Sequence, residues 1–135
     1  MLFKRCDISS YGNELTARAN QGMGEVSNIR VQAIATDANL TLGISDIAGG
    51  AVMFTGFTAG RTVTTPTAAQ IAAAAPDMDI GDSFSFTLSV IPAFAGTLAA
   101  GAGVTLAGRT AVPASGNVYV VVTKTAAAAF TWTSL

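Results

Sequence analysis

Hydrophobic residues recur at every second position from residue 29 onward. Ile29, Val31 and Ala33 follow this spacing, and residues 40–44 repeat it. Side chains two residues apart share one face of a β-strand, so the pattern predicts strands with one buried face. The polar residues 37–39 between them are typical of a hairpin loop, and Gly49 and Gly50 precede a further strand at 52–57. The first half of the chain is therefore predicted to be a β-meander.

The segment Ser83–Val90 alternates polar and apolar residues without interruption. It predicts a strand whose apolar residues, Phe84 among them, face one core. Residues 96–108 predict a short hairpin with Gly101 and Gly103 at its turn.

Two further strands are predicted at residues 117–125 and 129–133. One face of the first carries Val118, Val120 and Val122, and the other carries Tyr119, Val121 and Thr123. Apolar residues on both faces are typical of a strand that is covered on both sides. This strand is expected at the centre of a sandwich or at a subunit interface.

One short helix is predicted at residues 68–75. Thr67 can cap its N-terminus, and Gln70 stands three residues later as the partner in a capping box. Pro76 cannot continue the helix. Pro66 favours an extended residue before it, which places the end of a strand near Val63.

Residues 1–24 are rich in Gly, Asn and Ser and show little periodicity. They are interpreted as an N-terminal arm that docks on a neighbouring subunit, with a disordered terminus as the alternative. Residues 25–135 are expected to form one β-rich domain. The fold class is mainly β: a compact antiparallel β-sandwich or tripod-like domain with one short helix.

The composition changes this picture, because a normal charged surface cannot be made from it. Of the 135 residues, 50% are hydrophobic and only 11% are charged, against about 25% charged in an ordinary soluble domain. The apolar stretches are interrupted too often for a transmembrane helix, which needs about 20 apolar residues. Burial against copies of the same chain is the better account. The basic residues are scattered and the net charge is −1, so neither nucleic acid nor membrane is expected as a partner.

Candidate chemistry is sparse. The chain has no histidine, which removes the usual general base and the commonest metal ligand. We expect no catalytic residues, no cofactor and no enzymatic activity. Asp77, Asp79 and Asp82, with Gly81 between them, form a weak candidate for a hard cation, although the spacing lacks the glutamate of an EF-hand. A solvated turn before the next strand is the alternative.

Three blocks in succession carry a family resemblance. They are residues 58–71 (TAGRTVTTPTAAQI), 81–84 (GDSF) and 98–106 (LAAGAGVTL). The order of these blocks resembles a β-rich module of tailed phages, which occurs in capsid decoration (cement) proteins and in the C-terminal parts of head and tail fibres. The resemblance covers about residues 55–135. It implies a compact β domain that trimerises on the virion surface of a bacteriophage.

Within this family the chain favours a cement protein, because it shows no repeat or heptad of a fibre stalk. The expected role is a structural virion protein that binds the major capsid protein as a homotrimer and stabilises the head. Its synthesis is expected in the host cytoplasm, since no signal peptide follows Met1 and Cys6 is the only cysteine. Candidate capsid contacts are Phe3, Lys4, Arg5, Tyr11 and Arg18.

Candidate trimer-interface residues come from the C-terminal strands and from one cation. They are Arg61, Val118, Val120, Val122, Phe130 and Trp132. Arg61 is expected to pair with a carboxylate of residues 77–82 or of a neighbouring subunit, or else to be a plain surface arginine. The alternative function is a fibre tip whose loops at 91–96 and 111–117 bind a host receptor or glycan. Aromatic residues make up only 7% of the chain, which argues against stacking on sugars.

Overall fold

A computed structural model describes residues 29–135. These residues form ten strands and two short helices. In chain order the elements are β1 (Arg30–Ile34), β2 (Leu40–Thr41), α1 (Ile44–Ile47), β3 (Gly50–Phe54), β4 (Arg61–Thr64), α2 (Ala68–Ala74), β5 (Ser83–Val90), β6 (Gly96–Ala99), β7 (Val104–Gly108), β8 (Ala111–Val112), β9 (Gly116–Ala126) and β10 (Ala129–Ser134).

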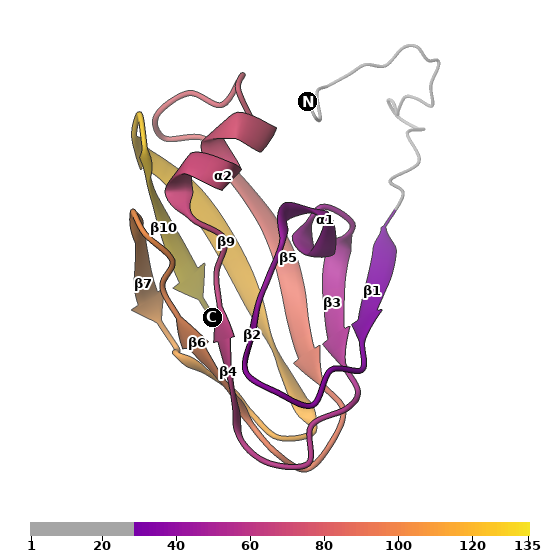
Figure 1. Ribbon diagram of the computed structural model, residues 1–135. Helices are drawn as coiled ribbons and strands as arrows, with labels where there is room; N and C mark the ends of the chain where they lie inside the picture. Colours follow the sequence, from indigo (N-terminus) through magenta and orange to yellow (C-terminus); the bar gives the residue numbers. More distant parts are fainter. Residues whose placement is uncertain (1–28) are drawn as a thin grey trace.

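The strands form two sheets that enclose the core (Figure 1). The six-stranded sheet has the order β1-β3-β5-β9-β10-β7, and the four-stranded sheet has the order β2-β4-β6-β8. Both helices lie at the same end of the sandwich, where they close it (Figure 1). The prediction of a mainly β fold is confirmed.

The chain crosses from one sheet to the other after each of the first eight strands. As a result β1 pairs in parallel with β3, β3 with β5, β2 with β4, and β4 with β6. The predicted β-meander is therefore wrong, and the sheets are mixed rather than antiparallel. Parallel neighbours need a crossover connection, and here each crossover includes a strand of the opposite sheet.

Two further local predictions are wrong. The predicted hairpin at 96–108 is split, because β6 belongs to the four-stranded sheet and β7 to the six-stranded one. The strand predicted at 40–44 ends at Thr41, and Ile44 begins helix α1. The Asp46 carboxylate accepts a hydrogen bond from the Gly43 N–H at 2.8 Å and so satisfies the start of this helix. The domain thus contains two short helices instead of one.

Helix α2 forms as predicted. The Thr67 hydroxyl accepts from the Gln70 N–H at 3.2 Å, and the Gln70 side-chain oxygen accepts from the Thr67 N–H at 3.0 Å. This capping box satisfies two backbone donors that the helix leaves unpaired. Ala68 and Ile71 face the core and are buried, so the helix is held by packing as well as by its cap.

The crossover loops at the end opposite the helices pack closely against one another. A Cβ atom on Gly56 would lie 2.0 Å from the carbonyl oxygen of Ala35. Only glycine allows this approach. The loop after β1 and the loop after β3 are therefore stacked in direct backbone contact.

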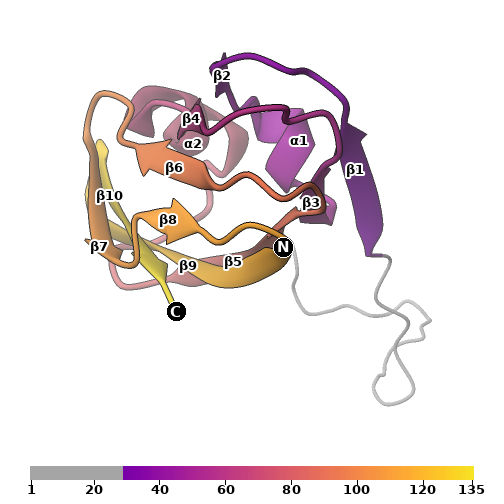
Figure 2. The same cartoon turned by 90° about the horizontal axis from the view of Figure 1, so that it is seen from below.

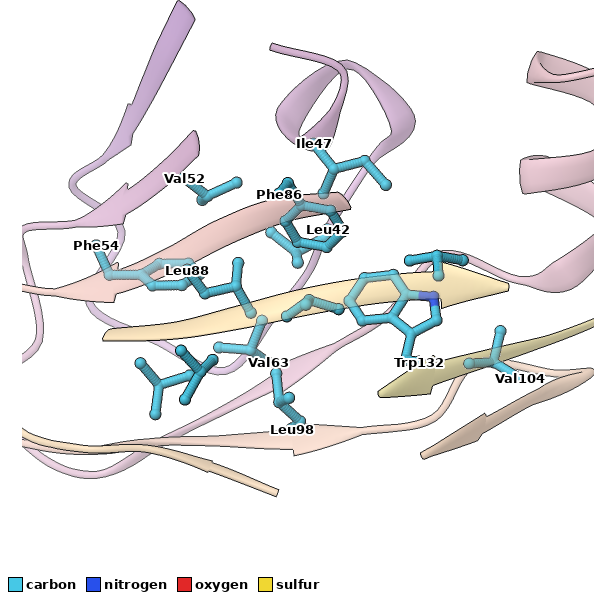
Figure 3. Close-up of a cluster of buried hydrophobic side chains, with 14 of the residues drawn as sticks. Leu42, Ile47, Val52, Phe54, Val63, Phe86, Leu88, Leu98, Val104 and Trp132 are labelled. Atoms are coloured by element: carbon cyan, nitrogen blue, oxygen red, sulfur yellow. The ribbon is translucent and has the colours of Figure 1, made fainter. Parts of the chain in front are cut away.

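The core lies between the two sheets and uses every second residue of the long strands. Phe86, Leu88 and Val90 of β5 are buried, as predicted, whereas Phe84 is half-buried. The indole of Trp132 packs edge-on against Phe86, with ring centroids 5.1 Å apart. Figure 3 shows Phe86, Leu88 and Trp132 of the six-stranded sheet with Val63 and Leu98 of the four-stranded sheet in one cluster. Burial of this apolar surface supplies the main driving force for the fold.

Candidate interaction surface

The six-stranded sheet has one face that packs on the core and one that points away from it. The strand register aligns the outward residues in rows, such as Val31, Ala51, Thr87 and Tyr119 across β1, β3, β5 and β9. We call these outward side chains the outer face. It consists of Val31, Ala33, Ala51, Met53, Ser83, Ser85, Thr87, Ser89, Thr105, Ala107, Asn117, Tyr119, Val121, Thr123, Thr131 and Thr133.

The outer face carries no charged side chain. In the strands of this sheet the only charged residues are Arg30 and Lys124, and both occupy the alternate, inward positions. Lys124 Nζ donates to the carbonyl oxygen of Met78 at 2.9 Å in the turn before β5. The face is instead built from hydroxyl groups and small apolar groups, with a hydrogen bond of 2.8 Å between the hydroxyls of Ser83 and Thr123.

None of the outer-face residues is buried within the described part of the chain. Tyr119 is 46% exposed and Val31 is 55% exposed, and Ala51 and Thr87 lie between them in the same row. Viewed from one end, the six-stranded sheet curves around the core, with β6 and β8 on its inner side (Figure 2). The outer face is therefore the convex side of the sheet and is open to contact.

This arrangement suits contact with another protein surface. Covering it removes no ionic group from water, and removing such groups is the most expensive part of burying a surface. The buried centres of protein interfaces are likewise depleted of charge. The face offers no cation to a phosphate backbone, whose binding depends on Lys and Arg.

Five of the six predicted interface residues lie elsewhere. Val118, Val120, Val122, Phe130 and Trp132 are at most 1% exposed and form the core of the single chain. Their assignment to a trimer interface is wrong, because a side chain enclosed by its own chain cannot reach another copy. The residues that alternate with them in β9 and β10 point away from the core. The signal that sequence reasoning passed over is the uncharged alternate set of β9 and β10, which starts at Asn117.

The sixth residue, Arg61, forms an ion pair within the chain. Its guanidinium lies 2.8 Å from the carboxylate of Asp37, not near residues 77–82. Asp37 also accepts hydrogen bonds from the hydroxyl and the N–H of Thr58. These two hydrogen bonds, with the contribution of Arg61, lower the pKa of Asp37 to about 2. The group joins the loop after β1 to the loop after β3 and to β4.

The three aspartates of the candidate cation site do not converge. The Asp82 carboxylate accepts from the N–H of Asp79 at 2.9 Å and so stabilises the turn that precedes β5. Residues 29–135 contain no group of three or more His, Cys, Asp or Glu side chains placed to hold a metal ion. This geometry matches a solvated turn before β5.

The two loops of the fibre-tip alternative lie in contact. Ser115 donates its N–H to the carbonyl oxygen of Pro92 at 2.9 Å. A shallow hollow of about 180 Å³ lies beside them and is lined by Ser89, Val90, Ile91, Ser115, Gly116 and Asn117. Ile91 and Phe94 are exposed on the same loop. These residues form a second surface at the end of the sandwich.

The candidate capsid contacts Phe3, Lys4, Arg5, Tyr11 and Arg18 lie outside the described residues. Over residues 29–135, no helix has the length and hydropathy needed to cross a membrane. No protein-family model, curated protein or solved structure matches the chain.

Proposed function

We propose that the chain is a structural protein of a tailed-phage particle, which binds the outer capsid surface as a homotrimer and stabilises the head. The observation that carries this proposal is the uncharged outer face of the six-stranded sheet. A convex layer of Ser, Thr, Ala and Val side chains can be covered by another protein surface without removing an ionic group from water.

The distribution of charge supports an assembling protein. Within residues 83–135 the only charged residues are Arg109 and Lys124, and neither lies on the outer face. A monomer would keep this uncharged area in water. Assembly in copies covers the area without leaving an unpaired charge.

The sequence blocks that resemble the phage module support the capsid assignment. Residues 58–71 run through β4 into α2, residues 81–84 begin β5, and residues 98–106 join β6 to β7. They therefore cover both sheets and the end of the sandwich that α2 closes. In the proposed role a trimer ties neighbouring capsid subunits together and resists the outward pressure of packaged DNA.

The test uses purified particles of the phage that encodes the chain. Gold-labelled antibody should decorate the head uniformly, and particles that lack the protein should release DNA at a lower temperature. Adding the recombinant full-length chain back should restore the release temperature. Absence of the protein from purified particles would contradict the proposal.

A second candidate, a fibre tip, is favoured by the contact between the 91–96 and 111–117 loops. Their hollow and the exposed Ile91 and Phe94 form a surface that could meet a receptor or glycan. In this case antibody should label a vertex or the fibres, and the recombinant chain should block adsorption of phage to cells. A uniform label on the head with no block of adsorption excludes this candidate.

A further inference from the structure

We infer that strand β1 pairs in antiparallel fashion with the β1 strand of a second copy of this chain. β1 is the last strand on one side of the six-stranded sheet (Figure 1). The unpaired backbone groups along its open edge specify this contact. It goes beyond the proposed function, because a twofold contact joins two copies and in the proposed trimer would link one trimer to the next.

The hydrogen bonds to β3 show which way each residue of β1 is turned. The N–H of Arg30 donates to the carbonyl oxygen of Gly49 at 2.8 Å. The carbonyl oxygen of Ile34 accepts from the N–H of Thr55 at 2.9 Å. The register between the two strands is continuous and parallel, so the even-numbered residues of β1 direct both backbone groups toward β3.

The odd-numbered residues of β1 therefore direct their backbone groups to the open side. These are Val31 and Ala33, and neither makes a backbone hydrogen bond across that side with any of residues 29–135. Their N–H and C=O groups form a row that repeats every second residue. An extended backbone that adds to the edge of a sheet satisfies such a row.

The other sheet edges in the described part of the chain are less suited to accept a strand. β2 and β8 have two residues each. β7 lies between Gly103 and Gly108, whose φ angles of 79° and 78° end the extended backbone on both sides. β1 has five residues and contains neither Pro nor Lys, which are among the residues that proteins use to protect an edge.

Both ends of β1 are fixed before any partner arrives. A Cβ atom on Gly49 would lie 2.5 Å from the carbonyl oxygen of Arg30, and the loop contact of Gly56 with Ala35 holds the other end. Val31 is nevertheless 55% exposed. The edge is thus ordered and accessible, which keeps the entropy cost of pairing low.

A second β1 matches this edge because the strand is complementary to itself. With Gln32 opposite Gln32 of the second copy, each N–H of Val31 and Ala33 meets a C=O of the other strand. The two Gln32 amides can donate to and accept from each other. Arg30 then lies opposite Ile34, so the two positive charges are at opposite ends of the contact and do not repel directly.

The first experiment traps this register with a disulfide in a Cys6→Ser background. Gln32→Cys would place two Cα atoms about 4.5 Å apart across the twofold axis, within the range of about 4.4–6.8 Å that a disulfide needs. Ala33→Cys is the matched control, because position 33 is more exposed but lies opposite Val31. Under a mild oxidant Gln32→Cys should form a covalent dimer at least tenfold faster. Equal rates, or no dimer of Gln32→Cys, would overturn the inference.

The second experiment removes one donor from the edge. Val31→Pro deletes an N–H on the open side and no hydrogen bond to β3, and edge strands tolerate proline in this position. Added to Gln32→Cys, it should slow formation of the dimer at least tenfold, with an unchanged circular dichroism spectrum. A folded double variant that dimerises at the original rate would contradict pairing through this edge.

The third experiment needs no substitution. Amide hydrogen exchange of the wild-type chain, read by NMR for Val31 and Ala33, should slow at least tenfold as the protein concentration rises. Slow exchange at every concentration would show that residues 1–28 of the same chain cover the edge. Fast exchange at every concentration would show that no copy pairs there. Either result overturns the inference.

The contact and the proposed function can fail separately. Phage heads that carry the protein although Gln32→Cys gives no dimer retain the function and lose this contact. A chain that dimerises through β1 but is missing from purified particles retains the contact and loses the function.

Discussion

Two adjacent valines of β9 lie on opposite sides of the six-stranded sheet. Val120 is completely buried against the core, whereas Val121 points to the outer face and is half-buried. Their residue type is the same and their backbone is continuous. The difference between them is what the fold places over each side, which is the four-stranded sheet over Val120 and no described segment over Val121.

This comparison teaches that apolar character in a strand does not say which side forms the core. The inner face holds the domain together, and the outer face remains available for assembly. Substitutions on the inner face should therefore change the free energy of unfolding, and substitutions on the outer face should change association. The predictions below test this division, and their expected effects decrease in order.

The largest effect is expected from Trp132→Ala, compared with Thr131→Ala. Trp132 fills the core beside Phe86, and deleting a buried aromatic costs about 3–5 kcal/mol of unfolding free energy. Thr131 is the outward neighbour and should cost under about 1 kcal/mol. Urea denaturation followed by circular dichroism measures both. Equal losses of unfolding free energy in the two variants would contradict the assignment of an inner and an outer face.

The sharpest comparison is Val120→Ala against Val121→Ala. Two buried methyl groups are lost at position 120, so we expect a loss of about 2–3 kcal/mol, including the cavity that remains. At position 121 the protomer should lose under about 0.5 kcal/mol. Denaturation of both variants at several protein concentrations separates this effect from association, because only association depends on concentration. A larger loss at position 121 would contradict the assignment of the inner face.

A smaller effect is expected at the helix that closes the inner space. Thr67→Ala removes the cap of α2 and should cost about 1 kcal/mol. Thr67→Ser keeps a hydroxyl at the same position and should retain most of the stability. The measurement is again the urea midpoint. If serine and alanine behave alike, the capping bond does not stabilise the helix.

The smallest effect concerns acid. The pKa of Asp37 falls from 3.8 to about 2 on folding, so the ionised group favours the folded state above pH 3.8. That contribution is lost as the pH falls from about 4 toward 2, because the unfolded chain takes up the proton first. Asp37→Asn should lower the urea midpoint at pH 5 and show a flatter decline below pH 4 than the wild type. Parallel declines in the two proteins would contradict the low pKa.

In the proposed trimer, acid should leave the contact between copies unchanged until the domain itself unfolds. No carboxylate lies on the outer face, so the Kd of association should be the same at pH 5 and pH 7. A change over this range would indicate that ionisable groups outside the face take part in the contact.

Much of the local structure was predictable. The uninterrupted alternation of β5 predicted its two ends and the burial of Phe86, Leu88 and Val90, and Thr67 with Gln70 predicted α2 and its cap. These features depend on neighbouring residues and on the two-residue period of a strand. The strands β9 and β10 were also located correctly, and so was the apolar set of Val118, Val120 and Val122 that shares one face.

The candidate site was not predictable in the same way. Arg61 could be recognised as an unusual cation, but its partner Asp37 lies 24 residues away in a loop that was expected to be a hairpin. The outer face consists of ordinary strand residues on six strands. These residues form one uncharged surface only because the pairing of the strands places them side by side.

The order of amino acids alone therefore set where the long strands β5, β9 and β10 run, which of their residues share a face, and where the second helix begins. The tertiary structure decided which strands are neighbours, that consecutive strands lie in opposite sheets, and which apolar face of β9 turned inward. The physical reason is that periodicity and capping act between residues close in sequence. Strand pairing and burial depend on contacts between distant segments, and these gain free energy only when the whole core closes.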